Sequence, residues 1–571
     1  MNERARLIAV ARGDATPDLV VEGAQVFSAF TKEWLATDVA VAAGRVAGLG
    51  RFEGGARIDG SGRYLVPGFI DAHVHIESSK LMMDEFARAV LPHGTTAVVC
   101  DPHEIANVLG RDGIHWMLDV CRDLPLEVFV MTPSCVPASA FESPSATLGP
   151  DDMESVLRRS HAIGIAEMMD FPGVISGDPR VLAKLELDGG AHVDGHAPGV
   201  RGHALDAYIA AGIRSDHEAT TFAEALEKRR KGMWVLIREA SNAHNLVDLL
   251  PLIREFGPDH CAFCTDDREP TDLFRLGHLD HMCRVAVAHG VSPEDALLLA
   301  GLHPARCHGL GDMGAIAPGY KADFLLLSDT TDFVVDRVFK EGRLVASNGA
   351  AVAFRRAEVP PEVRNTVRPA PVSVADFAIP SSGADVRVIE IIPEQLLTRV
   401  RIEAPLKENG VAVADPARDL AKIAVVERHN ATGRVGMGFV TGFGLRRGAF
   451  ASTVAHDAHN MVIVGVNDAD MAICARRLIA IEGGLVAAED GVVPAELPLP
   501  VAGLLSDQPF ESVVDDLERL ERCLAGLGVD VASPFMTLSF LALSVIPALK
   551  ITDRGLIDID TFELVPLEVD R

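Results

Sequence analysis

Histidines and carboxylates follow several short apolar runs in the first half of the chain. His73 and His75 stand two apart in the run GFIDAHVHIESS. Residues i and i+2 of a strand point to the same face, so both imidazoles could reach one ion. Other chemically capable groups follow later apolar runs, namely Glu167, His196, His217 and Asp266. Four imidazoles and two carboxylates suit two divalent cations with one carboxylate between them.

Taken alone, the His73 and His75 pair also fits two partly buried histidines that hydrogen-bond to the backbone. The whole set favours metal binding for an electrostatic reason. Polar groups buried at strand ends carry a large desolvation cost unless something pairs with them. A divalent cation accepts neutral imidazole and carboxylate together. We therefore predict a site for two divalent ions.

Such a site needs strands whose ends meet in one place. Between Pro67 and Gly309, β-type runs alternate with helix-length stretches. The runs are GFIDAHVH, TTAVVCD, EVFVMTP, GIAEMMD, AHVDGHAP, IRSDHE, MWVLIRE and HCAFCTDD. Alternating strands and helices predict a parallel sheet, and eight repeats in roughly 240 residues match a (β/α)₈ barrel. In that fold, catalytic groups project from the carboxyl ends of the strands.

The flanking segments predict further domains. Residues 1–66 and 310–370 hold short β-type runs and Gly-rich turns, which indicate two parts of one split β-sandwich domain. The barrel is expected at 67–309. Residues 371–571 combine runs such as AKIAVVERH with a helix-length stretch, DMAICARRLIAI, and indicate a C-terminal α+β domain. The predicted fold class is therefore α/β, with a barrel and two accessory domains.

Composition narrows the class of protein. The 571 residues carry 53 Lys and Arg against 81 Asp and Glu, a net charge of −28, and no basic run offers a footprint for nucleic acid. Apolar stretches are shorter than the roughly 20 residues that span a bilayer, and charges interrupt those at the start. Nine cysteines without a regular framework indicate reduced thiols. We expect a soluble cytoplasmic homo-oligomer that acts on a small molecule, with no nucleic-acid or membrane partner.

A different metal motif also deserves weighing. His75 and Glu77 form an H-x-E, and Cys261 and Cys264 form a CxxC, as in the zinc nucleobase deaminases. However, no proline precedes Cys261, the two pieces lie far apart in sequence, and the CxxC falls in an apolar run. We predict that both cysteines pack inside the barrel.

Longer strings carry a resemblance to a known family. VPGFIDAHVH before a barrel, with a split β-sandwich around it, resembles the amidohydrolase superfamily. The strings HVHIESS, FARAVLPHGTTAVVCDPHEIANVLG, IAEMMDFPGVISGDP, DGHAPG, CTDDREPTD and HDAHNMVIVGVND are similar to those of the bacterial adenine deaminase family. The likeness covers nearly the whole chain.

The resemblance implies hydrolytic deamination of adenine to hypoxanthine and ammonia, a reaction of purine salvage. It also implies two divalent ions per chain, Mn²⁺ or Fe²⁺. The matching ligand positions are His73, His75, Glu167, His196, His217 and Asp266. Glu167 takes the bridging position, where many members of the superfamily carry a carboxylated lysine. Asp266 is chosen over Asp267 because it follows the strand directly after Thr265.

The expected chemistry gives Asp266 and Glu167 catalytic roles. A metal-bound hydroxide would attack C6 of adenine, because the ion lowers the pKa of water from 15.7 towards about 7. Asp266 would accept the released proton and pass it to the departing amine. Charge then develops on N1, so a donor must lie near it. The candidate substrate contacts are Glu77, His103, Glu104 and Asp267. Alternatively, His103 and Glu104 simply cap the helix that follows them.

Two questions stay open at this stage. The segment His456-Asp457-x-His459-Asn460 could close the purine pocket, bind an additional ion or form a plain loop network. The same metal site could also serve another aminated heterocycle or a cyclic amide, because function resides in loops grafted on the fold. A third possibility for the function is a non-catalytic binding scaffold that has lost the metal. Such a scaffold would lack ligand residues, and the full set of six ligand residues argues against it.

Overall fold

The computed structural model describes residues 2–393 and 395–569. It opens with a helix, α1 (Glu3–Ala11), that the sequence did not lead us to expect. A four-stranded sheet follows, in the order β5 (Arg45–Leu49), β4 (Val39–Ala42), β1 (Leu19–Glu22) and β6 (Ala56–Asp59).

A seven-stranded sheet joins two distant parts of the chain. Its order is β19 (Ala350–Ala351), β18 (Arg343–Ser347), β17 (Val334–Lys340), β16 (Phe324–Asp329), β7 (Tyr64–Pro67), β2 (Gln25–Ser28) and β3 (Glu33–Ala36). Leu65 of β7 pairs with Leu326 of β16 in antiparallel register. One buried apolar cluster includes Val21 and Val41 of the smaller sheet and Phe324 of the larger one, so the two sheets share a core.

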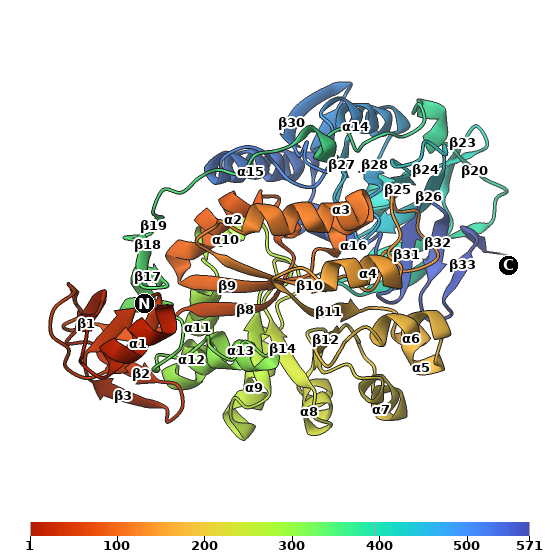
Figure 1. The fold of residues 1–571 in the computed structure, drawn as a ribbon. Helices are drawn as coiled ribbons and strands as arrows, with labels where there is room; N and C mark the ends of the chain where they lie inside the picture. Colours follow the sequence, from red (N-terminus) through yellow and green to blue (C-terminus); the bar gives the residue numbers. More distant parts are fainter. Residues whose placement is uncertain (1, 394, 570–571) are drawn as a thin grey trace.

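Eight parallel strands form the middle of the molecule (Figure 1). They are β8 (Phe69–Val74), β9 (Thr95–Cys100), β10 (Glu127–Thr132), β11 (Ala162–Met168), β12 (His192–Gly195), β13 (Ser215–Asp216), β14 (Trp234–Arg238) and β15 (Cys261–Cys264). One lies in each of the eight runs expected from the sequence. Strands β8 to β12 pair in chain order, and so do β13 to β15. A parallel bridge joins Val74 to Asp266, and the Arg214 N–H donates to the carbonyl of Val193.

Helices follow most of these strands and supply the outer layer. They are α2 (Met83–Val90), α3 (His103–Cys121), α4 (Pro150–Leu157), α5 (Phe171–Ser176), α6 (Pro179–Leu185), α7 (Gly202–Ala210), α8 (Phe222–Arg230), α9 (Leu246–Phe256), α10 (Pro270–Arg275), α11 (Leu279–Ala288), α12 (Pro293–Ala300) and α13 (Leu302–Cys307). Apolar side chains on both layers, such as Phe86 of α2 and Val98 of β9, belong to one buried cluster. The helices therefore pack against the strands and fix where the strands end.

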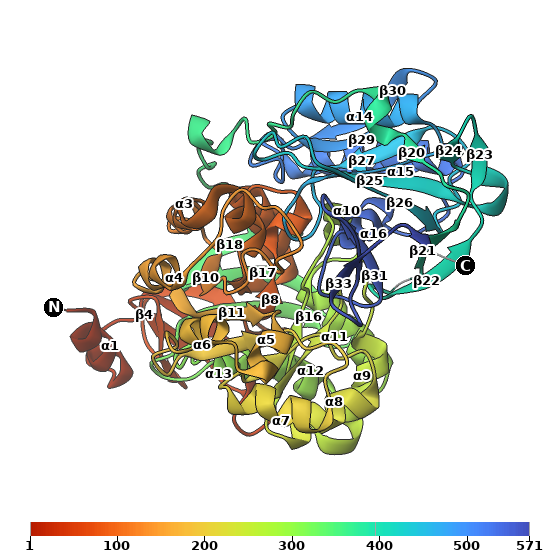
Figure 2. The ribbon, with the colours of Figure 1, turned by 90° about the vertical axis from the view of Figure 1, so that its right-hand side faces the viewer.

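The last third of the chain contains a nine-stranded sheet. Its strands are β22 (Thr398–Glu403), β21 (Asp385–Ile391), β26 (Val435–Thr441), β25 (Ala421–Val426), β28 (Met461–Gly465), β27 (Ala449–Ser452), β29 (Gly484–Glu489) and β30 (Val492–Pro498), with β34 (Glu568–Val569) paired to β21. Helix α14 (Asp468–Ala480) packs on β27, β28 and β29, and α15 (Phe510–Leu527) packs on β30. Both views place this part beside the strands β8 to β15 (Figures 1 and 2).

Smaller elements complete the C-terminal part. They are β20 (Ile379–Pro380), β23 (Leu406–Glu408), β24 (Val411–Val413), α16 (Pro534–Phe540), β31 (Leu549–Thr552), β32 (Gly555–Asp558) and β33 (Glu563–Val565). Among the described residues, no helix is both long enough and apolar enough to cross a membrane.

Candidate metal centre and active site

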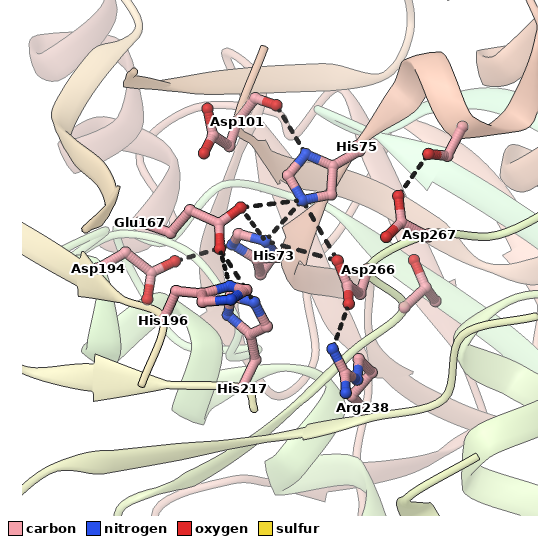
Figure 3. A network of polar contacts seen from close by, with 12 residues as sticks. His73, His75, Asp101, Glu167, Asp194, His196, His217, Arg238, Asp266 and Asp267 are labelled. Carbon is pink, nitrogen blue, oxygen red and sulfur yellow. Dashed lines mark hydrogen bonds and ion pairs between the residues drawn. The ribbon is translucent and has the colours of Figure 1, made fainter. Parts of the chain in front are cut away.

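Glu167, near the end of β11, lies between two pairs of histidines (Figure 3). Its Oε1 is 3.4 Å from His75 Nε2 and 4.0 Å from His73 Nε2. Its Oε2 is 2.6 Å from His196 Nδ1 and 3.3 Å from His217 Nε2. Each carboxylate oxygen thus faces a different pair of imidazoles, which is the placement that a bridging ligand requires.

The His73 and His75 side chains face each other through their Nε2 atoms, which are 3.1 Å apart. The Nδ1 of His73 donates to Asp194 Oδ2 at 2.8 Å, and the Nδ1 of His75 donates to the carbonyl of Asp101 at 2.9 Å. The two Nε2 atoms therefore point at each other and need a positive charge between them. Burial would lower the pKa of His75, but hydrogen bonds to Asp266 and Glu167 raise it well above its usual value, so a proton supplies that charge where a metal ion could replace it. Metal-binding histidines are held in this way by acceptors on their other nitrogen.

Asp266 follows β15 and completes this group. Its backbone is fixed against β8, because its N–H donates to the His73 carbonyl at 3.0 Å and its carbonyl accepts from the His75 N–H. The side chain presents Oδ1 to His75 Nε2 at 3.3 Å. All six residues expected as ligands thus lie together at the carboxyl ends of the strands, and all are buried.

The sequence analysis did not single out Arg238 and Glu218, which form an ion pair at this site. Arg238 is the last residue of β14, and its Nη1 donates to Asp266 Oδ2 at 2.9 Å. The same guanidinium binds Glu218, whose Oε1 is 3.6 Å from His217 Nε2. The rule that strand ends carry the chemistry could have found Arg238. It escaped because we searched the strand ends for metal ligands, and a guanidinium is never one.

The charges at the site favour a bound cation. Burial alone would raise the pKa of Asp266, but the hydrogen bond from His75 and the charge of Arg238 hold it well below its usual range. The pKa of Glu167 is also held well below its usual range, because His196 and His217 outweigh the effect of burial. Burial would lower the pKa of His217, yet Glu167 raises it to about 10. The ionised carboxylates therefore favour positive charge on this site, which protons on the imidazoles supply here and a metal ion could supply in their place.

A small cavity of about 20 Å³ lies over these residues. Besides five of the six expected ligands, the wall formed by the middle of the chain includes His103, Met169, Glu218 and Asp267. The opposite wall comes from the last third of the chain, and consists of Leu396, His456, Asp457, Phe540 and Leu543. The ring of Phe540 stacks on that of His456, with centroids 4.3 Å apart. The C-terminal part of the chain therefore covers the site.

Two of the four candidate substrate contacts line the cavity, and the other two do not. His103 and Asp267 line the cavity, whereas Glu77 and Glu104 do not. Glu104 Oε1 accepts a hydrogen bond from the Ser78 hydroxyl at 3.0 Å, and the same hydroxyl contacts Asp267. Glu77 Oε1 accepts from the N–H of Ile105 at 3.2 Å. Glu77 is therefore the side chain that caps the first turn of α3, a role considered above for His103 and Glu104.

The segment from His456 to Asn460 takes part in the pocket and in a loop network, and the additional ion stays a prediction, since His103, His456 and Asp457 offer ligand atoms within 4.8 Å of one another. His456 and Asp457 lie on the cavity wall, and Asp457 Oδ1 is 3.4 Å from His103 Nε2. His459 Nδ1 accepts from the N–H of Ala455, and Asn460 Oδ1 accepts from the N–H of Arg428. The first two residues face the pocket, whereas the last two hold the loop.

Cys261 and Cys264 do not lie in the site. Both are buried in β15, and they belong to separate apolar clusters: Cys261 packs with Phe263, and Cys264 with Ala72 and Leu236. Residues three apart on a strand point to opposite faces, so these two thiols cannot hold one ion. The prediction that they pack in the barrel agrees with these positions.

Known proteins resemble this chain over its whole length. The amidohydrolase family pattern matches residues 64–345, and the adenine deaminase C-terminal domain pattern matches residues 395–563. The chain is 46% identical to adenine deaminase 2 of Carboxydothermus hydrogenoformans over 565 residues, covering 99% of both chains. It is 48% identical to the adenine deaminase of Methylobacterium nodulans, again covering 99% of both, and 48% identical to that of Cereibacter sphaeroides, covering 98% of this chain and 99% of the other. At this identity and coverage, the chain belongs to the adenine deaminase family of the amidohydrolases.

Proposed function

We propose that this protein hydrolyses adenine to hypoxanthine and ammonia at a site for two divalent cations, Mn²⁺ or Fe²⁺. The observation that carries the metal site is the pair of Nε2 atoms of His73 and His75, which lie 3.1 Å apart while acceptors hold both Nδ1 atoms. The adenine substrate is supported by the names of the full-length relatives.

The residues present fit two such ions. His73, His75 and Asp266 offer ligand atoms that lie within 4.8 Å of one another, and they would hold the first ion. His196 and His217 would hold the second. Glu167 would contribute one oxygen to each. Imidazole and carboxylate together suit first-row divalent metals.

Asp266 is the residue that we propose moves the proton. When bound, the two ions would activate water for attack at neutral pH. Asp266 Oδ1 faces the ligand imidazoles, where it can accept the proton of the attacking water and return it to the leaving amine. Arg238 holds Oδ2 and so fixes the orientation of the carboxylate. Holding a catalytic group in one geometry lowers the entropic part of the activation free energy of the reaction.

The cavity provides separate surfaces for the faces and the edges of a purine. Its volume of about 20 Å³ is far below the roughly 300–1,000 Å³ typical of ligand pockets, so the covering residues must move apart to admit a purine. Phe540 and Leu543 offer apolar contact for the ring faces. His103, Asp267 and His456 offer donors and acceptors for the ring nitrogens. Direct substrate contact by Glu77 and Glu104 stays a prediction.

The same proposal includes the domain organisation. We infer that residues 67–309 form a closed (β/α)₈ barrel, since β8 is bridged to the residue that follows β15. Residues 1–66 and 310–370 would form the split β-sandwich, and 371–571 the C-terminal α+β domain. The homo-oligomeric state and the cytoplasmic location stay predictions.

The experiment is to load metal-free protein with Mn²⁺, add adenine, and measure hypoxanthine and ammonia together. Equal amounts of both products are expected. A second set of reactions offers a cyclic amide and another 6-amino purine, which represent the alternative function. Faster turnover of either than of adenine would overturn the proposed substrate while leaving the metal site intact. If protein that holds two ions turned over none of these compounds, the proposed enzymatic activity would be contradicted.

A further inference from the structure

A second group of possible metal ligands lies at the opposite end of the parallel strands. His192 begins β12, whereas His196 follows its end. Four residues of strand separate the two, which is about 13 Å. Cys307 ends α13, and His308 comes directly after it. Ligand atoms of His192, Cys307 and His308 all lie within 4.8 Å of one another.

The His308 ring is held in the form that binds metals. Its Nε2 donates to the carbonyl of Ala72 at 2.8 Å, which places the proton on Nε2 and leaves a lone pair on Nδ1. That Nδ1 is buried and has no hydrogen-bond partner. Burial lowers the pKa of His308 to about 3, so the ring is neutral. A buried acceptor without a partner is unfavourable, and a cation would satisfy it.

Cys307 is placed to share an ion with His192. Its Sγ is 3.9 Å from His192 Nε2. Around a tetrahedral Zn²⁺, with Zn–S of about 2.3 Å and Zn–N of about 2.0 Å, sulfur and nitrogen lie about 3.5 Å apart. A shift of a few tenths of an ångström would therefore bring both atoms into coordination. Burial raises the pKa of the Cys307 thiol, so the ion must displace its proton to solvent.

We propose that His192, Cys307 and His308 form a third cation site, separate from the two-ion site, for a soft divalent ion such as Zn²⁺. One thiolate and two imidazoles select Zn²⁺ over the harder Mn²⁺, whereas the two-ion site offers only imidazoles and carboxylates. His192 is only partly buried, and a water molecule would complete the tetrahedral coordination. The inference rests on these three residues and does not depend on the proposed reaction.

Hydrogen bonds join this site to the other one. His192 Nε2 lies 2.7 Å from the Ser215 hydroxyl, and that hydroxyl donates to Asp194 Oδ1. The other oxygen of Asp194 accepts from His73 Nδ1. Because the single Ser215 proton goes to Asp194, His192 donates to Ser215 when no ion is bound. Coordination through His192 Nε2 would break that bond, and would change the surroundings of a ligand of the two-ion site.

Cobalt provides a test that does not depend on activity. Metal-free protein is titrated with Co²⁺, and the near-ultraviolet band that arises only from thiolate-to-cobalt charge transfer is recorded. The band should rise until one equivalent per chain is bound to sulfur, with release of one proton, and Zn²⁺ should abolish it. The two-ion site contains no thiolate and adds only weak visible bands.

Three variants distinguish this site from adventitious binding. Cys307→Ser and His308→Gln should each lose the band and one equivalent of Zn²⁺, and the glutamine can still donate to the Ala72 carbonyl. Cys523→Ser is the matched control, because Cys523 is the one cysteine among the described residues that is not fully buried. It should keep the band. Far-ultraviolet circular dichroism verifies the fold of each variant. An absent band in folded wild-type protein, or a band that survives in Cys307→Ser, would overturn the proposal.

Discussion

Arg238 donates to Asp266 and to Glu218 from one buried guanidinium, and this ties two carboxylates at the edge of the metal centre to a single positive charge. The contact leaves Asp266 Oδ1 free to face the imidazoles. A residue that is neither a ligand nor a substrate contact therefore sets the orientation of the proposed proton carrier.

Replacing Arg238 should impair both stability and catalysis. Arg238→Gln leaves two buried carboxylates without their cation, which typically costs about 3–5 kcal/mol of folding free energy. The pKa of Asp266 should rise, because a charge that lowers it is lost. A base must be deprotonated to act, so the acid limb of the kcat/KM profile should move to higher pH. Arg254→Gln, on the exposed side of α9, is the control. An unmoved acid limb in folded Arg238→Gln would contradict this role.

Asp266→Asn should separate proton transfer from metal binding. Five other ligands remain, so much of the metal should stay bound, while kcat falls by about 10²–10⁴-fold. KM should change less, because the group acts mainly in the transition state. Asp267→Asn is the neighbouring control and should be milder. Recovery of the Asp266 variant by excess Mn²⁺, or a larger loss at Asp267, would show that Asp266 is only a ligand.

His217→Ala should lose metal and activity together, because it removes an imidazole that faces Glu167 Oε2 at 3.3 Å. The measurement is metal per chain by elemental analysis, alongside turnover of adenine. His203→Ala is the control, since that side chain is fully exposed on α7. Two bound ions and full turnover in His217→Ala would remove His217 from the proposed ligand set.

Glu167→Gln tests whether Glu167 bridges the two ions. An amide oxygen can still coordinate but carries no charge for two ions, so both should bind more weakly or only one should remain. Competition with a chelator of known affinity measures the change. Glu218→Gln is an informative comparison, because Glu218 also lies near His196 and His217 but binds Arg238. Unchanged metal affinity in Glu167→Gln would assign the bridge to another residue.

Acid stability should depend on Glu127, which binds Lys321 and Lys340 and is 11% exposed. Burial would raise the pKa of Glu127, but the two lysines lower it from 4.5 to about 2. The carboxylate therefore stabilises the fold above pH 4.5, and this stabilisation is lost as the pH falls towards 2. The shift corresponds to at most about 3 kcal/mol. Urea unfolding between pH 5 and pH 3 should show a shallower decline for Glu127→Gln than for wild type. Exposed Glu255→Gln should follow wild type.

The sequence was most informative where the chemistry is local. Each of the six expected ligands is read from a short apolar run and the polar residue at its end, and the structure brings all six together. That rule works because parallel strands end at one side of the sheet. It gives no information on which side chains meet across strands, so the pairing of Arg238 with Glu218 could not be predicted.

The cavity wall illustrates a second limit. Leu396, Phe540 and Leu543 are ordinary apolar residues that lie far in sequence from the strands they cover. Nothing in their local pattern distinguishes them from core residues, since burial by one domain of another leaves no periodic signal. The His456 segment was noticed because two histidines and an aspartate lie close together in its sequence. Its residues that line the cavity could be told apart from those that hold the loop only when the contacts of each were known.

The pairing of Leu65 with Leu326 also has a consequence for synthesis of the chain on the ribosome. About 260 residues separate the two strands, so β7 is made long before its neighbour β16. At roughly 5–20 residues per second, the wait is on the order of tens of seconds. During that time β7 has an unpaired edge, which is a template for wrong strand pairing. The larger sheet can therefore be completed only after the intervening strands and helices have been made.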